Sequence, residues 1–548
     1  MISKHRTAGL LVFSFCLLLA GLLSPPVLLA QDVEVDSADP NNAAQGTASL
    51  NVIVTGKHFD KSAKAKFFVT GTTNPGGITV NSTTFVNPTQ LVANITVSST
   101  ATTTKFDTVV TLSSTGRTGK GIELFSVTKK GTSTKCTLAP LPSAFTLVGL
   151  LNPTGAYSGG GFGVLVRATK ITLGGLDVRV VAVSVGQANR LEIFFLDPTS
   201  GQILDGTIIG TAGQVQPHIT LPVPLQPRCL AFGDFNADGV PDIVVGGAYA
   251  YLGIIQNGVL SNSAGIPVLT TGGRSVAAGD LDGNPGDELA VGDDGAGKVY
   301  LYKFNALPSP SFALFQTLTS PMPNTKGSDQ FGTGVAIADV TGGAAPDVIV
   351  EAPNSTLNQP AGPGRVYVFP GYAFGSSVVA LSTPGQTSSW VGKVIAGDVD
   401  GGYTDVIGIA GTTALVFSGL VSSNQSPTFT LRAVPGFDGS YGNDLDASDL
   451  DADSLAEVLT GAPNSSNCPS YKSVGAAYVF MPSALAPTQP PAEYLLQPPS
   501  LNSGGTTTFG GYGFATAAVP GSRLFLVGEN GRIINGVATG QVYVYRVN

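Results

Sequence analysis

Oxygen-bearing residues recur at fixed spacing in the segment 234–242. Positions 1, 3, 5 and 9 carry a carboxylate or amide, and position 7 can contribute its backbone carbonyl. These five positions are Asp234, Asn236, Asp238, Asp242 and Val240. A hard cation such as Ca²⁺ takes about six to eight oxygen ligands, so a tight loop with this spacing can enclose one.

The same spacing returns in two further full loops and in two weaker ones. The second full loop offers Asp280, Asp282, Asn284, Gly286 and Glu288, with Gly286 at position 7. The third offers Asp449, Asp451, Asp453, Leu455 and Glu457. The weaker copies are Asp339, Thr341 and Asp347, and then Asp398, Asp400 and Asp405, which is one residue short. We expect Ca²⁺ in the three full loops and none in the two weaker ones.

The loops are expected to join strands. An EF-hand places a bidentate Glu at position 12, but position 12 after Asp234 is Val245, within a β-branched run. The alternative to a metal site is an Asx turn, in which the carboxylates accept hydrogen bonds from their own backbone and hold no ion. Three or four acids within nine residues repel one another without a counter-charge, which favours calcium in the full loops.

The composition indicates an all-β, acidic protein. The 548 residues include 71 Gly and 37 Pro, and only 12% of them are charged, which is typical of short strands joined by tight turns. The formal net charge is −8, and the five loops hold more than half of the acids beyond residue 130. A nucleic-acid-binding protein needs a basic stripe to displace phosphate counterions, so we expect no nucleic-acid partner.

The first 30 residues have the order of a secretory signal peptide. Basic residues precede the apolar stretch 8–23, and the small residue Ala30 stands before Gln31 at a suitable cleavage point. We therefore expect a secreted protein that reaches the periplasm, the cell surface or the medium, with no integral membrane segment after cleavage. An uncleaved membrane anchor is the alternative.

The mature chain keeps three cysteines, Cys136, Cys229 and Cys468. An odd number in an oxidising compartment allows at most one pair within the chain, and the spacing does not say which. Disulfide bonds are therefore not expected to be what holds this fold together.

Residues 31–128 contain several runs in which apolar and polar side chains alternate with a period of two, as expected for a β-sandwich. The motifs at 50–59, 65–68 and 89–95 resemble those of the immunoglobulin-like IPT/TIG domains. A generic fibronectin-like sandwich is the competing assignment. Residues 129–145 have turn-forming residues and no periodicity, and we expect a linker there.

A repeat of about 45 to 60 residues occupies the region 146–548. Each fuller copy has an aromatic-Gly pair, an acidic loop, an apolar strand ending near Gly-Ala-Pro and an outgoing strand such as Gly-Val-Tyr-Val-Phe. The clearest copy runs from Tyr441 through Asp449 and Pro463 to Phe480. These elements resemble the FG-GAP repeats of the integrin α-subunit β-propeller.

The resemblance implies a β-propeller of seven four-stranded blades with cations in the blade loops. Six copies can be counted from residue 228 onward, and a seventh is expected within 150–205, so six or seven blades remain open. Closure of the ring would remove the sheet edges that invite aggregation. Integrin-like ligand recognition does not carry over, because the adhesion motif Asp-x-Ser-x-Ser is absent.

Catalytic signatures are largely absent: the sequence has no His-Glu-x-x-His and no Gly-x-Ser-x-Gly. The mature histidines are His58 and His218, and we expect the latter to be a turn or packing residue. We therefore expect no catalytic residues and a non-enzymatic binding or adhesion protein with a protein or glycan partner. Two alternatives stay open: a secreted hydrolase or lyase on a propeller scaffold, and a structural surface-layer or matrix protein.

Overall fold

The computed structural model describes most of the chain beyond residue 31. The described ranges are 32–129, 138–153, 161–173, 175–186, 188–204, 218–224, 226–246, 249–252, 265–268, 273–306, 308–321, 329–343, 345–353, 364–371, 377–381, 390–465, 474–486, 488–500, 511–534 and 537–548. The expected signal peptide 1–30, Cys136 and Cys468 lie outside them. The described residues form strands and no helix, which confirms the all-β class. None of them belongs to a helix that could cross a membrane.

The chain divides into two compact units, Met1–Gly131 and Thr132–Asn548. The described part of the first unit forms two four-stranded sheets, ordered β1-β3-β6-β5 and β2-β8-β7-β4. Its strands are β1 (Glu34–Asp39), β2 (Asn42–Ala44), β3 (Leu50–Lys57), β4 (Ala63–Val69), β5 (Ile78–Asn87), β6 (Gln90–Val97), β7 (Lys105–Leu112) and β8 (Thr118–Thr128). In β6, Leu91, Ala93, Ile95 and Val97 are buried on one face, as the alternation predicts. They belong to one core shared by both sheets.

The described part of the second unit folds into seven four-stranded sheets and one small ribbon. The first three sheets hold β10 (Phe162–Leu173), β11 (Leu176–Val185), β12 (Arg190–Leu196), β13 (His218–Pro222); β14 (Leu230–Gly233), β15 (Asp242–Val245), β16 (Tyr249–Tyr251), β17 (Ile266–Pro267); and β18 (Ser275–Gly279), β19 (Glu288–Asp293), β20 (Lys298–Asn305), β21 (Ser311–Thr319). The next three hold β22 (Gly334–Ala338), β23 (Asp347–Ala352), β24 (Arg365–Phe369), β25 (Val379–Leu381); β26 (Trp390–Gly397), β27 (Asp405–Ala410), β28 (Thr413–Phe417), β29 (Phe429–Arg432); and β30 (Leu445–Ser448), β31 (Glu457–Ala462), β32 (Ala476–Met481), β33 (Ala492–Leu496). The last holds β34 (Tyr512–Ala518), β35 (Leu524–Glu529), β38 (Gln541–Val547) and β9 (Phe145–Leu151), and the ribbon holds β36 (Ile533–Ile534) and β37 (Val537–Ala538).

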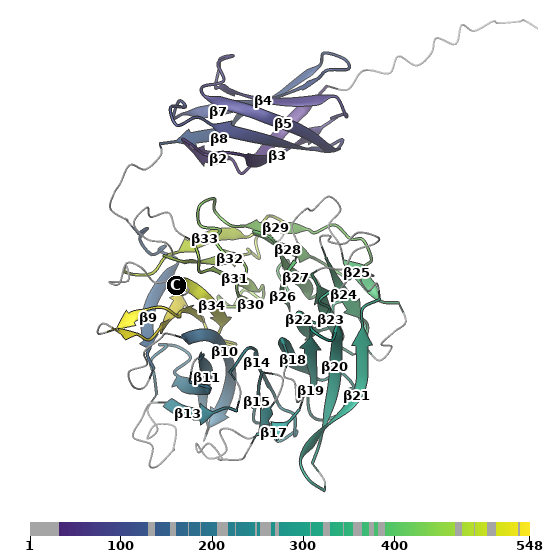
Figure 1. Ribbon diagram of the computed structural model, residues 1–548, viewed down its shortest axis with the longest axis vertical. Helices are drawn as coiled ribbons and strands as arrows, with labels where there is room; N and C mark the ends of the chain where they lie inside the picture. Colours follow the sequence, from purple (N-terminus) through teal and green to yellow (C-terminus); the bar gives the residue numbers. More distant parts are fainter. Residues whose placement is uncertain are drawn as a thin grey trace, which may run out of the picture. The chain divides into compact units, whose positions relative to one another are not determined.

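The seven sheets of the second unit follow one another around a common centre (Figure 1). The first strand of each sheet, β10, β14, β18, β22, β26, β30 or β34, contacts the first strand of the next, and β34 contacts β10. One hydrophobic cluster lies between each neighbouring pair of sheets, including the seventh and the first. Each sheet therefore buries its faces against two neighbours, which a single four-stranded sheet cannot do alone.

The aromatic-Gly pairs of the repeat lie where a first strand meets the preceding sheet. Phe331 and Tyr512 are fully buried, and the glycines that follow them, Gly332 and Gly513, have φ values of 93° and 84°. A Cβ at Gly513 would lie 1.9 Å from the carbonyl oxygen of Ala476 in the preceding sheet. Only glycine combines this left-handed backbone with such close approach, so the pair fixes where neighbouring sheets meet.

Candidate functional site: acidic loops and a central cavity

Five of the sheets in the second unit carry an acidic loop between their first and second strands. The acid that ends each loop is also the first residue of the second strand, and it is buried. These acids are Asp242, Glu288, Asp347, Asp405 and Glu457. Each begins a strand whose following residues are β-branched or otherwise apolar, so the strand draws the carboxylate into the protein while the rest of the loop stays near the surface.

The buried acid performs the same local task in every loop. One of its oxygens accepts a hydrogen bond from the backbone N–H of the apolar residue at position 2. The five bonds are Phe235 to Asp242 (3.0 Å), Leu281 to Glu288 (2.7 Å), Val340 to Asp347 (2.9 Å), Val399 to Asp405 (2.8 Å) and Leu450 to Glu457 (2.6 Å). The position-2 side chains are themselves buried. The hydrogen bond and the buried side chain thus hold position 2 of each loop close to the acid at its end.

The other end of each loop is an Asx turn. The residue at position 4 is left-handed in all five loops, as at Gly283 (φ 71°) and Ala452 (φ 67°), and the position-1 aspartate accepts backbone hydrogen bonds at this turn. Asp280 accepts from Gly283 at 2.6 Å, and Asp449 accepts from Ala452 at 2.8 Å. The Asx-turn alternative is therefore realised, but it does not compete with a metal site, because an ionised carboxylate has about four acceptor positions.

The structure brings together carboxylates in three of the five loops. One oxygen from each acid lies within 4.8 Å of the others in the groups Asp280, Asp282 and Glu288; Asp398, Asp400 and Asp405; and Asp449, Asp451 and Asp453. The acids of the 234 and 339 loops form no such group among the described residues. The sequence predicted metal in the 234 loop and none in the 398 loop, whereas the structure groups the carboxylates of the 398 loop and not those of the 234 loop.

The remaining predicted ligands of these loops lie beside the carboxylates. Asn236 donates from its amide to Asp238 at 3.0 Å, and Thr341 donates from its hydroxyl to Asp347 at 3.0 Å. At the predicted carbonyl positions, the backbone N–H groups of Val240 and Leu455 donate to the aspartates two residues before them, Asp238 and Asp453. These hydrogen bonds hold the predicted ligand positions close to the carboxylates of their own loop.

The 280 loop has two further predicted ligands, Asn284 and Gly286. Asn284 donates its backbone N–H to Asp282 at 2.9 Å, and Gly286 takes a φ of 100°. Lys303, on β20 of the same sheet, forms an ion pair with Asp282 and lies 3.9 Å from Glu288. The 280 group therefore has an ion-paired lysine, whereas at the 449 group Arg523 donates to the backbone carbonyl of Asp451 at 2.9 Å and forms no ion pair with a loop carboxylate among the described residues.

The more buried acids of the 398 and 449 loops, Asp405, Asp451 and Glu457, have raised pKa values. Burial, together with the charges of neighbouring aspartates, raises the pKa of Glu457 to about 8 and that of Asp405 to about 7. The pKa of Asp451 is also raised, by burial and then by Asp453. A divalent cation would remove this penalty, because it stabilises the charged form of every carboxylate around it. The donor set, all oxygen, suits a hard cation.

Two pairs of neighbouring loops are joined by hydrogen bonds, and all five loops connect the first and second strands of their sheets. Asp234 and Asp287 exchange two hydrogen bonds of 2.8 Å between the first and second acidic loops. Ala456 donates to the carbonyl of Asp398 at 2.5 Å between the fourth and fifth. Any ion held in one loop would therefore also fix the position of its neighbour. We call the edge formed by these five loops the loop face.

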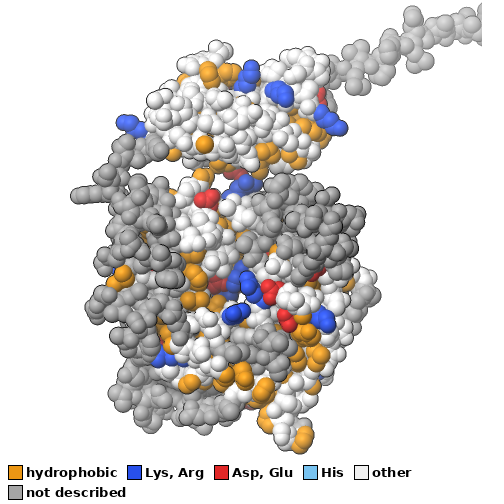
Figure 2. All heavy atoms as spheres, viewed as in Figure 1, with side chains coloured by type: hydrophobic (Ala, Val, Ile, Leu, Met, Phe, Trp, Pro, Cys, Tyr) orange, Lys and Arg blue, Asp and Glu red, His pale blue; other side chains and the backbone are white. Residues whose placement is uncertain are grey.

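A cavity of about 820 Å³ lies at the centre of the second unit, and the first strands of all seven sheets contribute to its wall. Figure 2 shows basic and acidic side chains gathered in the middle of this unit. The charged residues that line the cavity are Arg167, Arg228, Arg274, Lys393, Asp444 and Asp446. They come from strands that are far apart in the sequence and meet only because the first strands converge.

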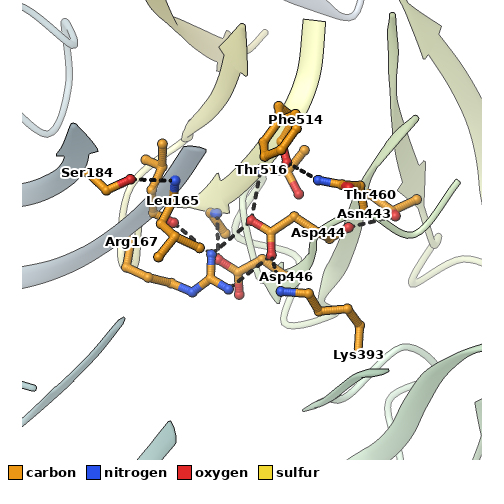
Figure 3. A network of polar contacts seen from close by, with 12 residues as sticks. Leu165, Arg167, Ser184, Lys393, Asn443, Asp444, Asp446, Thr460, Phe514 and Thr516 are labelled. Atoms are coloured by element: carbon orange, nitrogen blue, oxygen red, sulfur yellow. Dashed lines mark hydrogen bonds and ion pairs between the residues drawn. The ribbon is translucent and has the colours of Figure 1, made fainter. Parts of the chain in front are cut away.

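Asp444 is the centre of a network of polar contacts in the cavity wall (Figure 3). Arg167 forms two hydrogen bonds of 3.0 Å to its two carboxylate oxygens, and Lys393 lies 3.3 Å away. The backbone N–H of Thr516 donates to Asp444 at 3.1 Å. Burial opposes the ionised form of Asp444, but the charges of Arg167 and Lys393 outweigh it and lower the pKa to about 2.

The neighbouring carboxylate, Asp446, has a different environment. Its oxygens accept backbone hydrogen bonds of 3.0 Å from Ala518 and Ala447. Burial raises its pKa to about 6, although the positive charge of Arg167 opposes this shift. The two acids of the cavity thus differ in their ion pairs: Asp444 pairs with Arg167 and Lys393, whereas Asp446 forms no ion pair among the described residues.

No motif in the sequence predicted the cavity. Arg167 and Asp444 are 277 residues apart, and no local spacing connects them. A weak signal did exist: Arg274 and Lys393 each follow a glycine at the start of a first strand, and Asp444 follows Gly442 by two residues. Charged residues at the beginning of an otherwise apolar strand could have been noted as lining residues.

Comparisons with known proteins identify no relative. The sequence matches no family model and no curated protein. Among solved structures, an arginine-to-alanine triple mutant of AofleA from Arthrobotrys oligospora has 11% identity and a TM-score of 0.26, over 71% of this chain and 94% of that one. A mutant Tc holotoxin pore from Photorhabdus luminescens has 13% identity and a TM-score of 0.29, over 91% of this chain; this chain spans 25% of its length. These TM-scores are too low to establish a shared fold.

Proposed function

We propose that the chain is an exported, cation-stabilised protein that binds a protein or glycan partner and catalyses no reaction. In this proposal the second unit is a seven-bladed β-propeller of the FG-GAP type, and the first is an IPT/TIG-like immunoglobulin sandwich. The cyclic contacts of the seven first strands support the propeller. Two four-stranded sheets around one core support the sandwich.

The observation that carries the proposal is the recurrence of one acidic-loop geometry along the loop face. In the 449 loop, Asp449, Asp451, Asp453 and Glu457 would hold the ion; in the 398 loop, Asp398, Asp400 and Asp405 would do so. Calcium would supply the positive charge that lets these acids ionise together, and binding to the folded state alone would stabilise it. The ion would thereby make the loop face rigid enough to present a surface to a partner.

The hydrolase or lyase alternative has less support. Two carboxylates with well-separated pKa values are a recognised arrangement for an acid and a base, and Asp444 and Asp446 have this property. However, Asp444 is held by Arg167, Lys393 and a backbone N–H, while both oxygens of Asp446 accept backbone hydrogen bonds. Groups this fully engaged are suited to fixing strands in place.

The metal part of the proposal is tested by thermal unfolding of the full chain in calcium and in EGTA. We expect a melting temperature that rises with calcium concentration and saturates, and a much smaller response to magnesium, which prefers near-ideal octahedral sites. Equal melting temperatures in calcium and in EGTA would overturn the proposal.

The binding part is tested separately, with the purified chain on a glycan array in calcium and in EGTA. Retention on specific glycans that is lost in EGTA would support a binding protein whose loop face needs the ion. Release of shortened glycans during incubation would instead favour the hydrolase or lyase, and the Asp446→Asn variant would then abolish that release. Self-association with no retained ligand would favour the structural-protein alternative.

A further inference from the structure

The positive charges of the central cavity outnumber its negative ones. Four basic residues line it, each from a different sheet: Arg167 on β10, Arg228 before β14, Arg274 before β18 and Lys393 on β26. Against them stand Asp444 and Asp446, the only acids in the wall among the described residues. With both acids ionised, the wall carries an excess of two positive charges.

The excess is concentrated on the side formed by the second and third sheets. Arg167 and Lys393 are paired with Asp444 on the opposite side. The Arg228 and Arg274 side chains are both exposed, and neither forms a hydrogen bond or an ion pair with another described residue. These two guanidinium groups are therefore the ones available to a ligand.

The two available arginines belong to segments that touch each other. Cys229, next to Arg228, donates its thiol hydrogen to the carbonyl of Gly273, next to Arg274, across 3.5 Å. All four basic residues act electrostatically on this buried thiol, since each lowers the pKa of Cys229, although burial outweighs them and raises it to about 12. Arg228 and Arg274 thus lie on adjoining segments of the cavity wall.

We propose that the central cavity binds a small ligand that carries an oxyanion group, a carboxylate, sulfate or phosphate, on a polar body, and that Arg228 and Arg274 hold the oxyanion. Arginine is suited to this task because its planar donors match the geometry of such groups. A volume of about 820 Å³ is in the usual range for small-molecule sites. The remaining wall offers polar groups from Gln226 and Asn443 to the body of the ligand.

This site goes beyond the proposed function and does not rest on it. The lining residues of the cavity include none of the predicted metal ligands of the loop face. Ligand binding in the cavity is therefore expected with or without an ion in the loops, so failure of either proposal can be recognised independently of the other.

The test is calorimetric titration of the full chain in saturating calcium. The probes are glucuronate, glucose 6-phosphate and glucose 6-sulfate, with glucose as the uncharged match. We expect at least one charged probe to bind at least about tenfold more tightly than glucose, and its affinity to fall as NaCl is raised. The best of the three identifies the oxyanion. No preference of any charged probe over glucose would overturn the proposal.

Variants then locate the site. Arg228→Gln and Arg274→Gln should each lower the affinity for the preferred probe by about tenfold, while Arg274→Lys should retain part of it. Arg365→Gln, on β24 and outside the cavity wall, removes the same charge and should leave the affinity unchanged. Because both cavity arginines are exposed, the variants should have the same melting temperature as the parent protein. Equal losses in Arg365→Gln and the cavity variants would overturn the proposal by showing a general charge effect.

Discussion

Carboxylates on the loop face and in the central cavity have the same chemistry but opposite surroundings. Asp444 in the cavity meets Arg167 and Lys393, and its pKa falls to about 2. Glu457 on the loop face is buried beside three aspartates, and its pKa rises to about 8. The fold thus pairs Asp444 with two cations at the centre, whereas the acids of the 449 loop form no ion pair among the described residues; Arg523 donates only to the backbone carbonyl of Asp451, at 2.9 Å.

The difference lies in how far along the chain the partner is found. At the centre, seven strands from the whole unit converge, so a distant arginine can reach an aspartate. On the loop face, each cluster is built from about nine consecutive residues, and a short acidic segment has no room for its own cation. In the function proposed above, a cation from solution supplies the counter-charge of these loops. The predictions below test this contrast, beginning with the largest effect.

Asp444→Asn should be the most damaging single change. It removes the negative charge between Arg167 and Lys393, which are only 25% and 32% exposed, and leaves two partly buried cations facing each other. We expect a loss of about 3 kcal/mol in the free energy of unfolding, measured by urea denaturation. Asp438→Asn, at an exposed position, is the matched control and should change stability by less than about 0.5 kcal/mol. Similar values for both variants would remove the contrast.

Asp449→Asn should have a large effect only when calcium is present. The variant loses a ligand of the 449 loop, so it should forfeit most of the stabilisation that this loop draws from the ion, about 2 to 3 kcal/mol at saturating calcium. In EGTA the loss should be small, because removing one of several repelling charges offsets part of the lost turn. The measurement is unfolding with and without EGTA. An equal loss in both conditions would assign Asp449 a turn function alone.

Glu351 lies beside the cavity and forms no ion pair among the described residues, although the charge of Lys393 acts on it. Its Oε1 accepts from Gly392 at 2.6 Å, its Oε2 has no hydrogen-bond partner among the described residues, and burial raises its pKa from 4.5 to about 8. The folded state therefore keeps a proton that the unfolded chain releases above pH 4.5. This contribution to stability is complete below pH 4.5 and is lost as the pH rises to about 8, by at most about 1.4 kcal/mol per pH unit.

Glu351→Gln should remove that pH dependence. Urea unfolding at pH 5, 6.5 and 8 should show a shallower decline in stability than in the parent protein. Glu493→Gln, on the exposed part of β33, provides the same substitution at the surface and should leave the decline unchanged. Parallel curves for the parent and Glu351→Gln would show that Glu351 ionises normally.

The smallest expected effect concerns the internal lysine of the 280 loop. Lys303 pairs with Asp282, so the lysine and an ion compete for the same carboxylate. Lys303→Gln should strengthen calcium binding to this loop by a few-fold, because an ion pair near the surface, here with side chains 38% and 16% exposed, contributes only about 0.2 to 1 kcal/mol. The measurement is calcium titration by calorimetry, with Lys298→Gln as control. Unchanged calcium affinity would show that Lys303 does not compete with the ion for Asp282.

The local features of this structure could be predicted from the sequence. Acids spaced by two residues next to β-branched runs predicted the strand-loop-strand units, because turn formation and strand propensity depend on neighbours in the chain. The grouping of carboxylates in the structure differs from the sequence ranking of the loops. The 398 loop looked defective because it is one residue short, yet Asp405 still accepts the hydrogen bond from Val399 at 2.8 Å, as the terminal acid does in the longer loops.

The non-local part could not be predicted from spacing. Arg167 meets Asp444 only after seven first strands have converged, and Lys303 reaches Asp282 through the pairing of β19 with β20. Such contacts depend on which strands become neighbours. The sequence alone therefore indicated the short acidic loops, but not the central cavity.

Because β9 pairs with β38, the sheet that contains β9 cannot be completed until the last strand of the chain has been synthesised. The side chains of Thr146 and Asn548, at the ends of these strands, form a hydrogen bond of 2.6 Å across 402 residues of sequence. At about 5 to 20 residues per second, a ribosome needs about 20 to 80 seconds between the two strands. During that interval β9 cannot join its final sheet and exposes an unpaired edge, a condition that favours aggregation. A protein with this topology has reason to depend on chaperones while it is being made, whatever its stability afterwards.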